Sequence, residues 1–178
     1  FTKAALSFAF QHPTLTLMYN ALGAGKTVPA QYWLLSFAQY DALKNVAARS
    51  EPVTLPKDLK ALRLTAPCYA LSFEITQGLD DLASLLLGLT QYMNQRNFNM
   101  FLHDHQAIFI PREDVEVPSG FDNHRFGGLE MIGCFVMKSA EALELAQPAS
   151  LLRGIQEVSY STTKRQQLEA YIDHTYGG

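Results

Sequence analysis

The spacing of apolar residues predicts helices in two central parts of the chain. Apolar residues recur every three or four positions through residues 77–96, "QGLDDLASLLLGLTQYMNQR", which gives one apolar helix face with Asp80 and Asp81 in a first turn that favours negative charge. Residues 2–11, "TKAALSFAFQ", carry a similar face. That helix is expected to end at His12, because the residue before a proline avoids helical geometry.

Two further helices are predicted in the C-terminal third. Residues 139–159 begin with Ser139, a residue type that caps helix N-termini, and Gly154 marks a possible break in this helix. Residues 162–178, "TTKRQQLEAYIDHTYGG", form a polar helix that ends in glycines.

Alternating or β-rich apolar runs predict the strands. They lie at residues 14–20, 68–76 and 129–138, and residues 97–112, "NFNMFLHDHQAIFIPR", form a hairpin that turns at "HDHQ". Residues 30–39, "AQYWLLSFAQ", fit either a buried strand or a helix, and the proline-rich segment 51–67 fits a loop or an edge segment. Hairpins mixed with helices indicate an α+β fold, an antiparallel sheet with helices packed on it.

Composition fits one soluble domain that spans residues 1–178. The chain is 48% hydrophobic and 11% aromatic, which is ample for a packed core, and its net charge is −3. A mildly acidic chain lacks the basic field that nucleic-acid binding needs, while a few local groups suffice to hold a small anion. No apolar run is long enough to cross a membrane, and Cys68 and Cys134 lie inside apolar runs, so we expect reduced core thiols and a cytoplasmic location. No cofactor is indicated.

The loop "YNALGAGKTVPAQYW" raises the question of phosphate binding. Gly25-Lys26-Thr27 after a predicted strand matches the end of a P-loop, whose backbone N–H groups surround a phosphate. However, Asn20 stands where the first glycine of that motif belongs, and Pro29 lies where its helix would run. Lys26 remains the side chain most suited to a phosphate, and Arg112, at the end of a strand, is a second candidate.

Other clusters favour simpler interpretations. His103 and His105 flank Asp104 at a hairpin turn, where a metal would need further ligands, so a solvated turn is favoured over a metal site. Glu113 and Asp114, in a loop that also contains Glu116, are interpreted as solvated acids and not as an acid–base pair.

Two stretches, "YNALGAGKTVPAQYWLLSF" and "NFNMFLHDHQAIFIPREDVEVPSGF…GGLEMIGCFVMK", together resemble the histidine-triad-like nucleotidyltransferases. The most similar branch is the GDP-hexose and diadenosine-polyphosphate phosphorylase group, which is related to galactose-1-phosphate uridylyltransferase. The resemblance covers roughly residues 1–160. It implies a single histidine-triad-like domain that corresponds to the C-terminal part of a longer family fold, because family members have strands upstream of the first helix predicted here. It also implies a homodimer, or a second polypeptide that completes the sheet.

The resemblance fails where the family's chemistry lies. Placing Pro29 on the family's proline puts Gln31, Trp33 and Leu35 at the positions of its His-x-His-x-Gln motif, whose second histidine is the nucleophile. Trp33 cannot replace it, because the indole nitrogen is a donor only. A pocket around Trp33 without a histidine would exclude covalent histidine catalysis.

Three functions therefore stay open: a nucleotidyltransferase or phosphorylase relative that binds a nucleoside phosphate or nucleotide sugar, with the usual histidine nucleophile replaced; a non-catalytic scaffold or regulatory subunit of the same fold; and a P-loop-type ATP-binding protein. Whether the chain is an enzyme is left open, and no metal site is predicted. The predicted ligand-binding residues are Asn20, Gly23, Gly25, Lys26, Thr27, Gln31 and Arg112.

Overall fold

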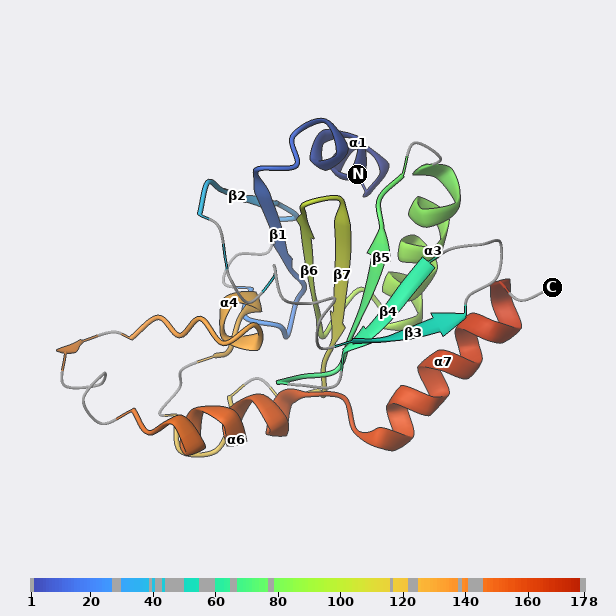
Figure 1. The fold of residues 1–178 in the computed structure, drawn as a ribbon. Coiled ribbons are helices and arrows are strands. Elements are labelled where there is room, and N and C mark those ends of the chain that lie inside the picture. Colours follow the sequence, from blue (N-terminus) through green and yellow to red (C-terminus); the bar gives the residue numbers. More distant parts are fainter. Residues whose placement is uncertain are drawn as a thin grey trace.

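A computed structural model describes residues 2–26, 30–38, 40, 43, 50–54, 60–64, 67–76, 79–115, 117–121, 125–137, 139–140 and 146–176. Within these residues, seven strands form one antiparallel sheet in the order β2-β1-β6-β7-β5-β4-β3 (Figure 1). The strands are β1 (Thr16–Asn20), β2 (Leu34–Ser36), β3 (Ser50–Thr54), β4 (Lys60–Leu64), β5 (Ala70–Glu74), β6 (Phe98–His103) and β7 (Gln106–Pro111). The helices are α1 (Thr2–Gln11), α3 (Leu79–Tyr92), α4 (Gly128–Met131), α6 (Pro148–Val158) and α7 (Thr162–Tyr176).

The predicted hairpin forms the centre of the sheet. β6 and β7 pair from Phe98 opposite Pro111 to His103 opposite Gln106. Asp104 and His105 make the two-residue turn with φ of 44° and 58°, the left-handed geometry that matches the twist of paired strands. The α+β prediction is therefore confirmed, and the helices at residues 2–11 and 79–92 lie where the apolar periodicity placed them.

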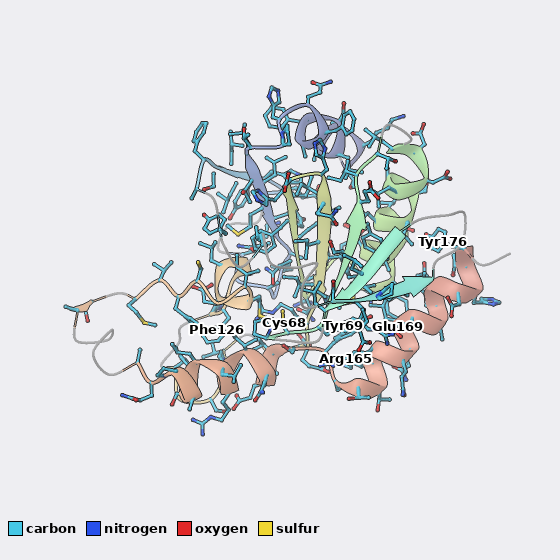
Figure 2. The ribbon with its side chains drawn as sticks, in the orientation of Figure 1. Cys68, Tyr69, Phe126, Arg165, Glu169 and Tyr176 are labelled. Atoms are coloured by element: carbon cyan, nitrogen blue, oxygen red, sulfur yellow. The ribbon has the colours of Figure 1, made fainter. Side chains whose placement is uncertain are left out.

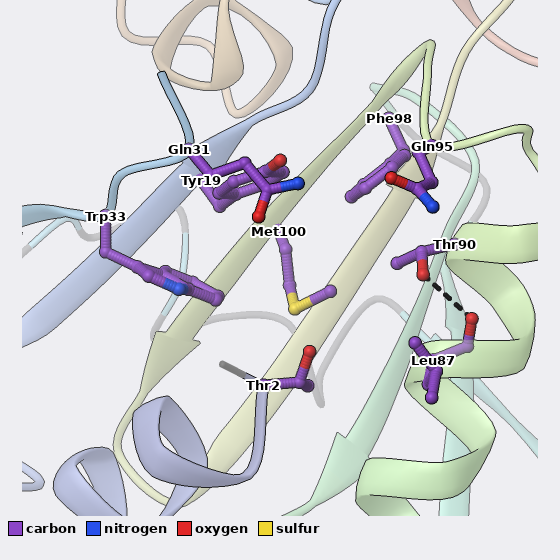
Figure 3. A pocket seen from close by; sticks show the side chains of 9 residues that line it. All are labelled: Thr2, Tyr19, Gln31, Trp33, Leu87, Thr90, Gln95, Phe98 and Met100. Carbon is purple, nitrogen blue, oxygen red and sulfur yellow. Dashed lines mark hydrogen bonds between the residues drawn. The ribbon is translucent and has the colours of Figure 1, made fainter.

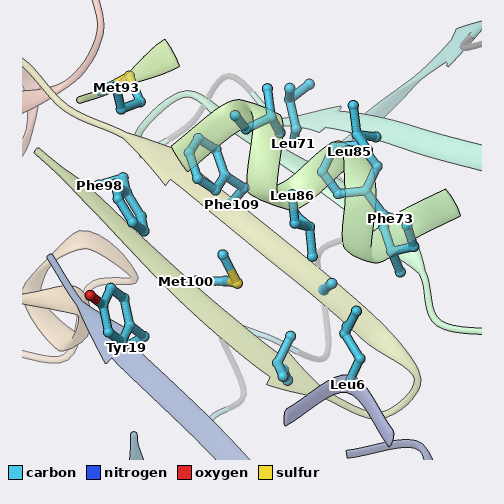
Figure 4. Packing of buried hydrophobic residues seen from close by; sticks show 14 of the residues in the cluster. Leu6, Tyr19, Leu71, Phe73, Leu85, Leu86, Met93, Phe98, Met100 and Phe109 are labelled. Atoms are coloured by element: carbon cyan, nitrogen blue, oxygen red, sulfur yellow. The ribbon is translucent and has the colours of Figure 1, made fainter. Parts of the chain in front are cut away.

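Each face of the sheet carries its own apolar layer, because side chains alternate between the faces along a strand. On one face, α1, α3 and α7 pack over a layer that includes Tyr19, Met100 and Phe109 (Figure 4). On the other face, α4 and α6 pack over a layer that includes Phe101, Ile108 and Phe126. The sheet thus forms the middle of three layers.

The C-terminal helix α7 is attached to the sheet through polar contacts as well as through buried Leu168 and Ile172. The Tyr69 hydroxyl donates a hydrogen bond to Glu169 Oε1 over 3.0 Å, and the Arg165 guanidinium lies 5.2 Å from the centre of the Tyr69 ring (Figure 2). The tail is therefore a polar helix, as predicted, and packs against the sheet through two buried apolar residues and these polar contacts.

One predicted strand, at residues 129–138, needs correction. Residues 129–138 were expected to form a strand, but they begin in helix α4, and Cys134–Met137 belong to no strand. Met131 and Phe135 bury their apolar side chains against the sheet face itself. The apolar run was therefore compatible both with a strand inside the sheet and with a segment packed on the sheet face. Strand β1 has no free edge for a further strand, because it already pairs with β2 and β6.

The proline-rich segment contains two paired strands, β3 and β4. β3 is the edge strand of the sheet, where Pro52 is tolerated because an edge strand does not need every N–H group, and this agrees with the edge alternative. β4 was not predicted, because the sequence analysis expected only a loop or an edge segment here, whereas β4 lies inside the sheet between β3 and β5. Of the predicted segment 30–39, the described residues 30–38 supply the short edge strand β2 and no helix. The predicted cap at Ser139 adjoins residues outside the described part of the chain.

Candidate ligand pocket and the loop beside it

A pocket of about 220 Å³ lies on the face of the sheet that α1 and α3 cover (Figure 3). Its floor is formed by neighbouring strands, because Tyr19 of β1 is the register partner of Met100 of β6. Gln31 and Trp33, from the segment between β1 and β2, line one side. The remaining lining residues come from α1, from the C-terminal half of α3 and from the turn and strand that follow it: Thr2, Leu87, Thr90, Gln95 and Phe98.

Aromatic rings line the floor of this pocket in a row. The ring centres of Trp33 and Tyr19 lie 5.4 Å apart, those of Tyr19 and Phe98 lie 5.6 Å apart, and the second pair is stacked. These separations are those of interacting aromatic pairs. Burial raises the pKa of Tyr19, so its phenol is neutral at physiological pH.

Helix α3 ends in a strained turn at the pocket. Asn94 and Gln95 have φ of 50° and 57°, and the Gln95 N–H donates to the Thr90 carbonyl over 2.7 Å. A non-glycine residue in this left-handed geometry costs about 1–2 kcal/mol. The turn directs the Gln95 amide towards the pocket opposite Gln31 (Figure 3).

A buried polar network occupies the opposite face of the same strands. Asn20 and Asn99 are register partners, and each is adjacent in its strand to a pocket residue, so their side chains point away from the pocket. Asn99 Nδ2 donates to Asn20 Oδ1 over 2.8 Å and to the Ala24 carbonyl over 2.9 Å. Asn20 Oδ1 also accepts from the Gly128 N–H over 3.1 Å. This network fixes the loop after β1 against the start of α4.

Arg112 completes the network from the end of β7. Its side chain is 1% exposed, and its Nη1 group donates to the Phe126 carbonyl and, over 3.5 Å, to Asn99 Oδ1. Burial lowers the pKa of Arg112 to about 10, and Cys68 and Glu130 act in the other direction. Within the described residues, Arg112 therefore supports the loop and does not reach the pocket.

Glycines allow the loop after β1 to approach residues 126–128 closely. Gly25 has a φ of +82°, and a Cβ built on it would lie 2.5 Å from Gly127 Cα. Gly23 has a φ of +80°, and a Cβ there would lie 2.0 Å from Asn97 Oδ1. Lys26, which follows, is 8% exposed, and Thr27 lies outside the described residues.

The predicted site residues are therefore divided between two places. Gln31 lines the pocket, while Asn20, Gly23, Gly25 and Arg112 belong to the loop and to the network behind it. The sequence analysis did not select the floor residues, because it interpreted the apolar positions of β1 and β6 as core. It also did not select Asn99, although an asparagine inside the apolar run "FNMFL" is the pattern of a buried polar contact.

The sequence analysis expected a solvated turn at His103–His105, but part of this turn is buried. His103 is 6% exposed, and its Nδ1 atom is hydrogen-bonded to the Thr16 hydroxyl over 3.0 Å. His105 packs against Phe10, with the ring centres 5.5 Å apart. Within the described part of the chain, no three His, Cys, Asp or Glu residues come together as a metal site.

Two further expectations concern the cysteines and membrane-spanning helices. Cys68 and Cys134 are free; Cys68 Sγ lies 3.3 Å from the Met131 carbonyl, and burial raises the pKa of Cys68 to about 12. Of the helices that the structure describes, none has the length and apolar character needed to cross a membrane.

The antiparallel sheet with helices packed on it matches an α+β histidine-triad-like fold. Two solved structures share it. They are yeast Ap4A phosphorylase Apa2 in complex with Ap4A (TM-score 0.66, 11% identity) and in complex with AMP (TM-score 0.64, 12% identity). The matches cover 89% and 90% of this chain, and in both cases the chain spans 63% of the yeast chain. At this identity the likeness concerns the fold. No protein-family model matches the sequence, and no curated protein does.

Proposed function

We propose that this chain binds a nucleoside phosphate or a nucleotide sugar in the pocket at Trp33, as a relative of the nucleotidyltransferases and phosphorylases whose histidine nucleophile has been replaced. The observation that carries the proposal is the position of Gln31 and Trp33. The resemblance placed these residues at the positions of the family's catalytic motif, and both line the same pocket. The yeast protein with the same fold was solved with Ap4A and with AMP, which makes nucleotides the first ligands to test.

The composition of the pocket favours binding without covalent catalysis. Its described lining contains no histidine, cysteine, lysine or acid, so nothing there could act as a base to activate the hydroxyls of Thr2, Thr90 or Tyr19 for attack on phosphorus. Lys26, together with Thr27, is the proposed phosphate contact at the end of the loop. Asn20, Gly23, Gly25 and Arg112 contribute by fixing that loop and its backbone groups.

The alternative is a non-catalytic scaffold or regulatory subunit of the same fold, either a homodimer or a protomer with a second polypeptide on its β2 edge. The exposed apolar side chains there favour a partner: Leu35 is 47% exposed and Phe37 is 78% exposed. A P-loop ATP-binding protein comes third, since residues 30–33 are not helical and β2 follows. For the first two functions we propose that residues 1–178 form a single histidine-triad-like domain that corresponds to the C-terminal part of a longer family fold.

The test is a thermal-shift panel on the whole chain with GDP, ADP, UDP and their sugar conjugates. A ligand at a hundredfold excess over its Kd stabilises the folded state by about 2.7 kcal/mol, so binding raises Tm. Lys26→Met keeps the buried stem of the lysine and removes its charge, and it is expected to reduce the shift. No shift with any nucleotide would refute the proposal.

Intact-mass spectrometry with Ap4A tests whether binding occurs without covalent catalysis. Binding without a nucleotidyl adduct on the protein is expected. A covalent adduct would show that another residue has replaced the histidine nucleophile.

A further inference from the structure

We infer that the pocket at Trp33 takes an uncharged planar ring, a nucleobase, and that the nucleoside without phosphate is sufficient for binding. The inference rests on the proposed function, and it specifies which part of the ligand enters the pocket. It places the phosphates outside, towards the loop after β1.

The lining residues that the structure describes carry no charge to compensate for that of a phosphate. These nine described residues are two threonines, two glutamines, Tyr19, Trp33, Phe98, Met100 and Leu87. A phosphate placed among them would lose its hydration without meeting a cation. A neutral ring meets no such penalty.

The shape of the floor suits a flat ring. Tyr19 and Phe98 are stacked at an interplanar angle of 25°, and Trp33 is tilted at 47° to Tyr19 at the side (Figure 3). Phe98 is also stacked on Phe109, so half-buried Trp33 is the ring on which we expect a base to stack, and such stacking is possible whichever base is present. The Met100 sulfur supplies a further polarisable contact between the rings.

Two amides can recognise the edge of that ring. Gln31 and Gln95 enter the pocket from opposite sides, and each amide offers both donors and an acceptor, as the edge of a base requires (Figure 3). Gln95 is held in a left-handed geometry that glycine would adopt without strain. Strain of this kind persists at ligand sites, which supports a binding role for Gln95.

The size of the pocket limits what enters it. At about 220 Å³ it is smaller than the roughly 300–1,000 Å³ typical of sites for drug-sized ligands. It therefore suits one ring system, and the ribose and phosphates of a nucleotide would extend out of it.

The fluorescence of Trp33 tests the inference, because Trp33 is the single tryptophan of the chain and lies in the pocket. Adenosine, guanosine and uridine are titrated beside their monophosphates and ribose 5-phosphate, with excitation beyond the absorption of the bases. We expect at least one nucleoside to change the emission with a Kd within about fivefold of its monophosphate, and ribose 5-phosphate to have no effect.

Three results would overturn the inference, and they separate it from the proposed function. Monophosphates that bind at least thirtyfold more tightly than their nucleosides, or binding of ribose 5-phosphate, would place the phosphate in the pocket and leave the proposed function standing. An emission change with free hexoses and none with nucleosides would replace the base by a sugar ring. No response to any compound, together with no thermal shift, would refute both.

A matched pair of variants tests the role of the Gln95 amide. Gln95→Gly removes the amide and relieves the left-handed strain, so we expect a higher Tm together with at least fivefold weaker nucleoside binding. Asn94→Gly relieves the same geometry at the neighbouring residue, which does not line the pocket, and should leave the Kd unchanged. Equal Kd values for Gln95→Gly and the wild type would remove Gln95 from the site.

Discussion

The close approach of the loop after β1 to residues 126–128 predicts a large effect of a single methyl group at Gly25. A Cβ at this position would lie 2.5 Å from Gly127 Cα and 2.9 Å from both Gly127 N and the Phe126 carbonyl oxygen. These are backbone atoms, which cannot rotate away as the end of a side chain can. Gly25→Ala must therefore separate the loop from the start of α4.

The expected magnitude has two parts. Left-handed geometry at φ of +82° costs an alanine about 1–2 kcal/mol. Overpacking against the backbone adds about 1–3 kcal/mol. The free energy of unfolding should therefore fall by about 2–5 kcal/mol, a large share of the roughly 5–15 kcal/mol that stabilises a typical domain.

Gly120 provides the matched control. Its φ is +84°, but a Cβ there would meet no atom within 4 Å. Gly120→Ala therefore carries the conformational cost alone, and the effect of alanine on the unfolded chain cancels between the two variants. The difference between them, about 1–3 kcal/mol, isolates the close backbone contact.

Urea unfolding of the two variants measures this difference. With a slope of about 2 kcal/mol per M, the midpoint of Gly25→Ala should lie about 0.5–1.5 M below that of Gly120→Ala. Equal midpoints would refute the reasoning, because they would mean that the loop does not pack against Gly127.

Three further predictions concern other parts of the molecule. Asn99→Ala removes the amide group that donates to both Asn20 Oδ1 and the Ala24 carbonyl. It should lower the free energy of unfolding, measured with urea, by about 1–3 kcal/mol. An unchanged urea midpoint would show that the network does not contribute to stability. Burial opposes ionisation of Glu113, but hydrogen bonds from Lys164 and the Ser161 N–H outweigh it and lower the pKa of Glu113. The carboxylate therefore stabilises the folded state above the ordinary pKa of about 4.3, and this stabilisation is lost as the pH falls through the lowered pKa. The Tm difference between wild type and Glu113→Gln should accordingly shrink from pH 6 to pH 3, and a constant difference would contradict this. Because burial raises the pKa of Cys68 to about 12, iodoacetamide should label half-buried Cys134 at least tenfold faster in the native protein, as read by peptide mass spectrometry; equal rates would contradict the buried position of Cys68.

Much of the fold could be predicted from local sequence patterns. The helix at residues 79–92 and the hairpin of β6 and β7 carry strong periodicity and a short turn, and both formed as predicted. Residues 129–138 misled, because apolar side chains can be buried by packing on a sheet face as well as by joining the sheet. Strand β4 was missed, since its pairing with β3 and β5 is a tertiary property.

The candidate site was harder to predict than the fold. Sequence reasoning assigned Gln31 and Trp33 to one locus by resemblance, and the pocket brings both together. It could not predict the role of Arg112, because an arginine at the end of a strand can either contact a ligand or form buried hydrogen bonds that support a loop. The strained geometry of Gln95 has no local sequence signal, and only the structure shows that this residue faces the pocket.

Methionine NMR tests the central claim, that a nucleotide binds in the pocket at Trp33, most directly. The chain has five methionines, of which Met100 lies in the pocket among the rings, while Met131 is buried on the opposite face of the sheet. With ¹³C-labelled methyl groups, assigned through Met100→Leu, titration with the nucleotide of the largest thermal shift should move the Met100 signal and leave Met131 in place. A saturable shift of Met131 with Met100 unchanged, or no shift of either signal, would contradict the account.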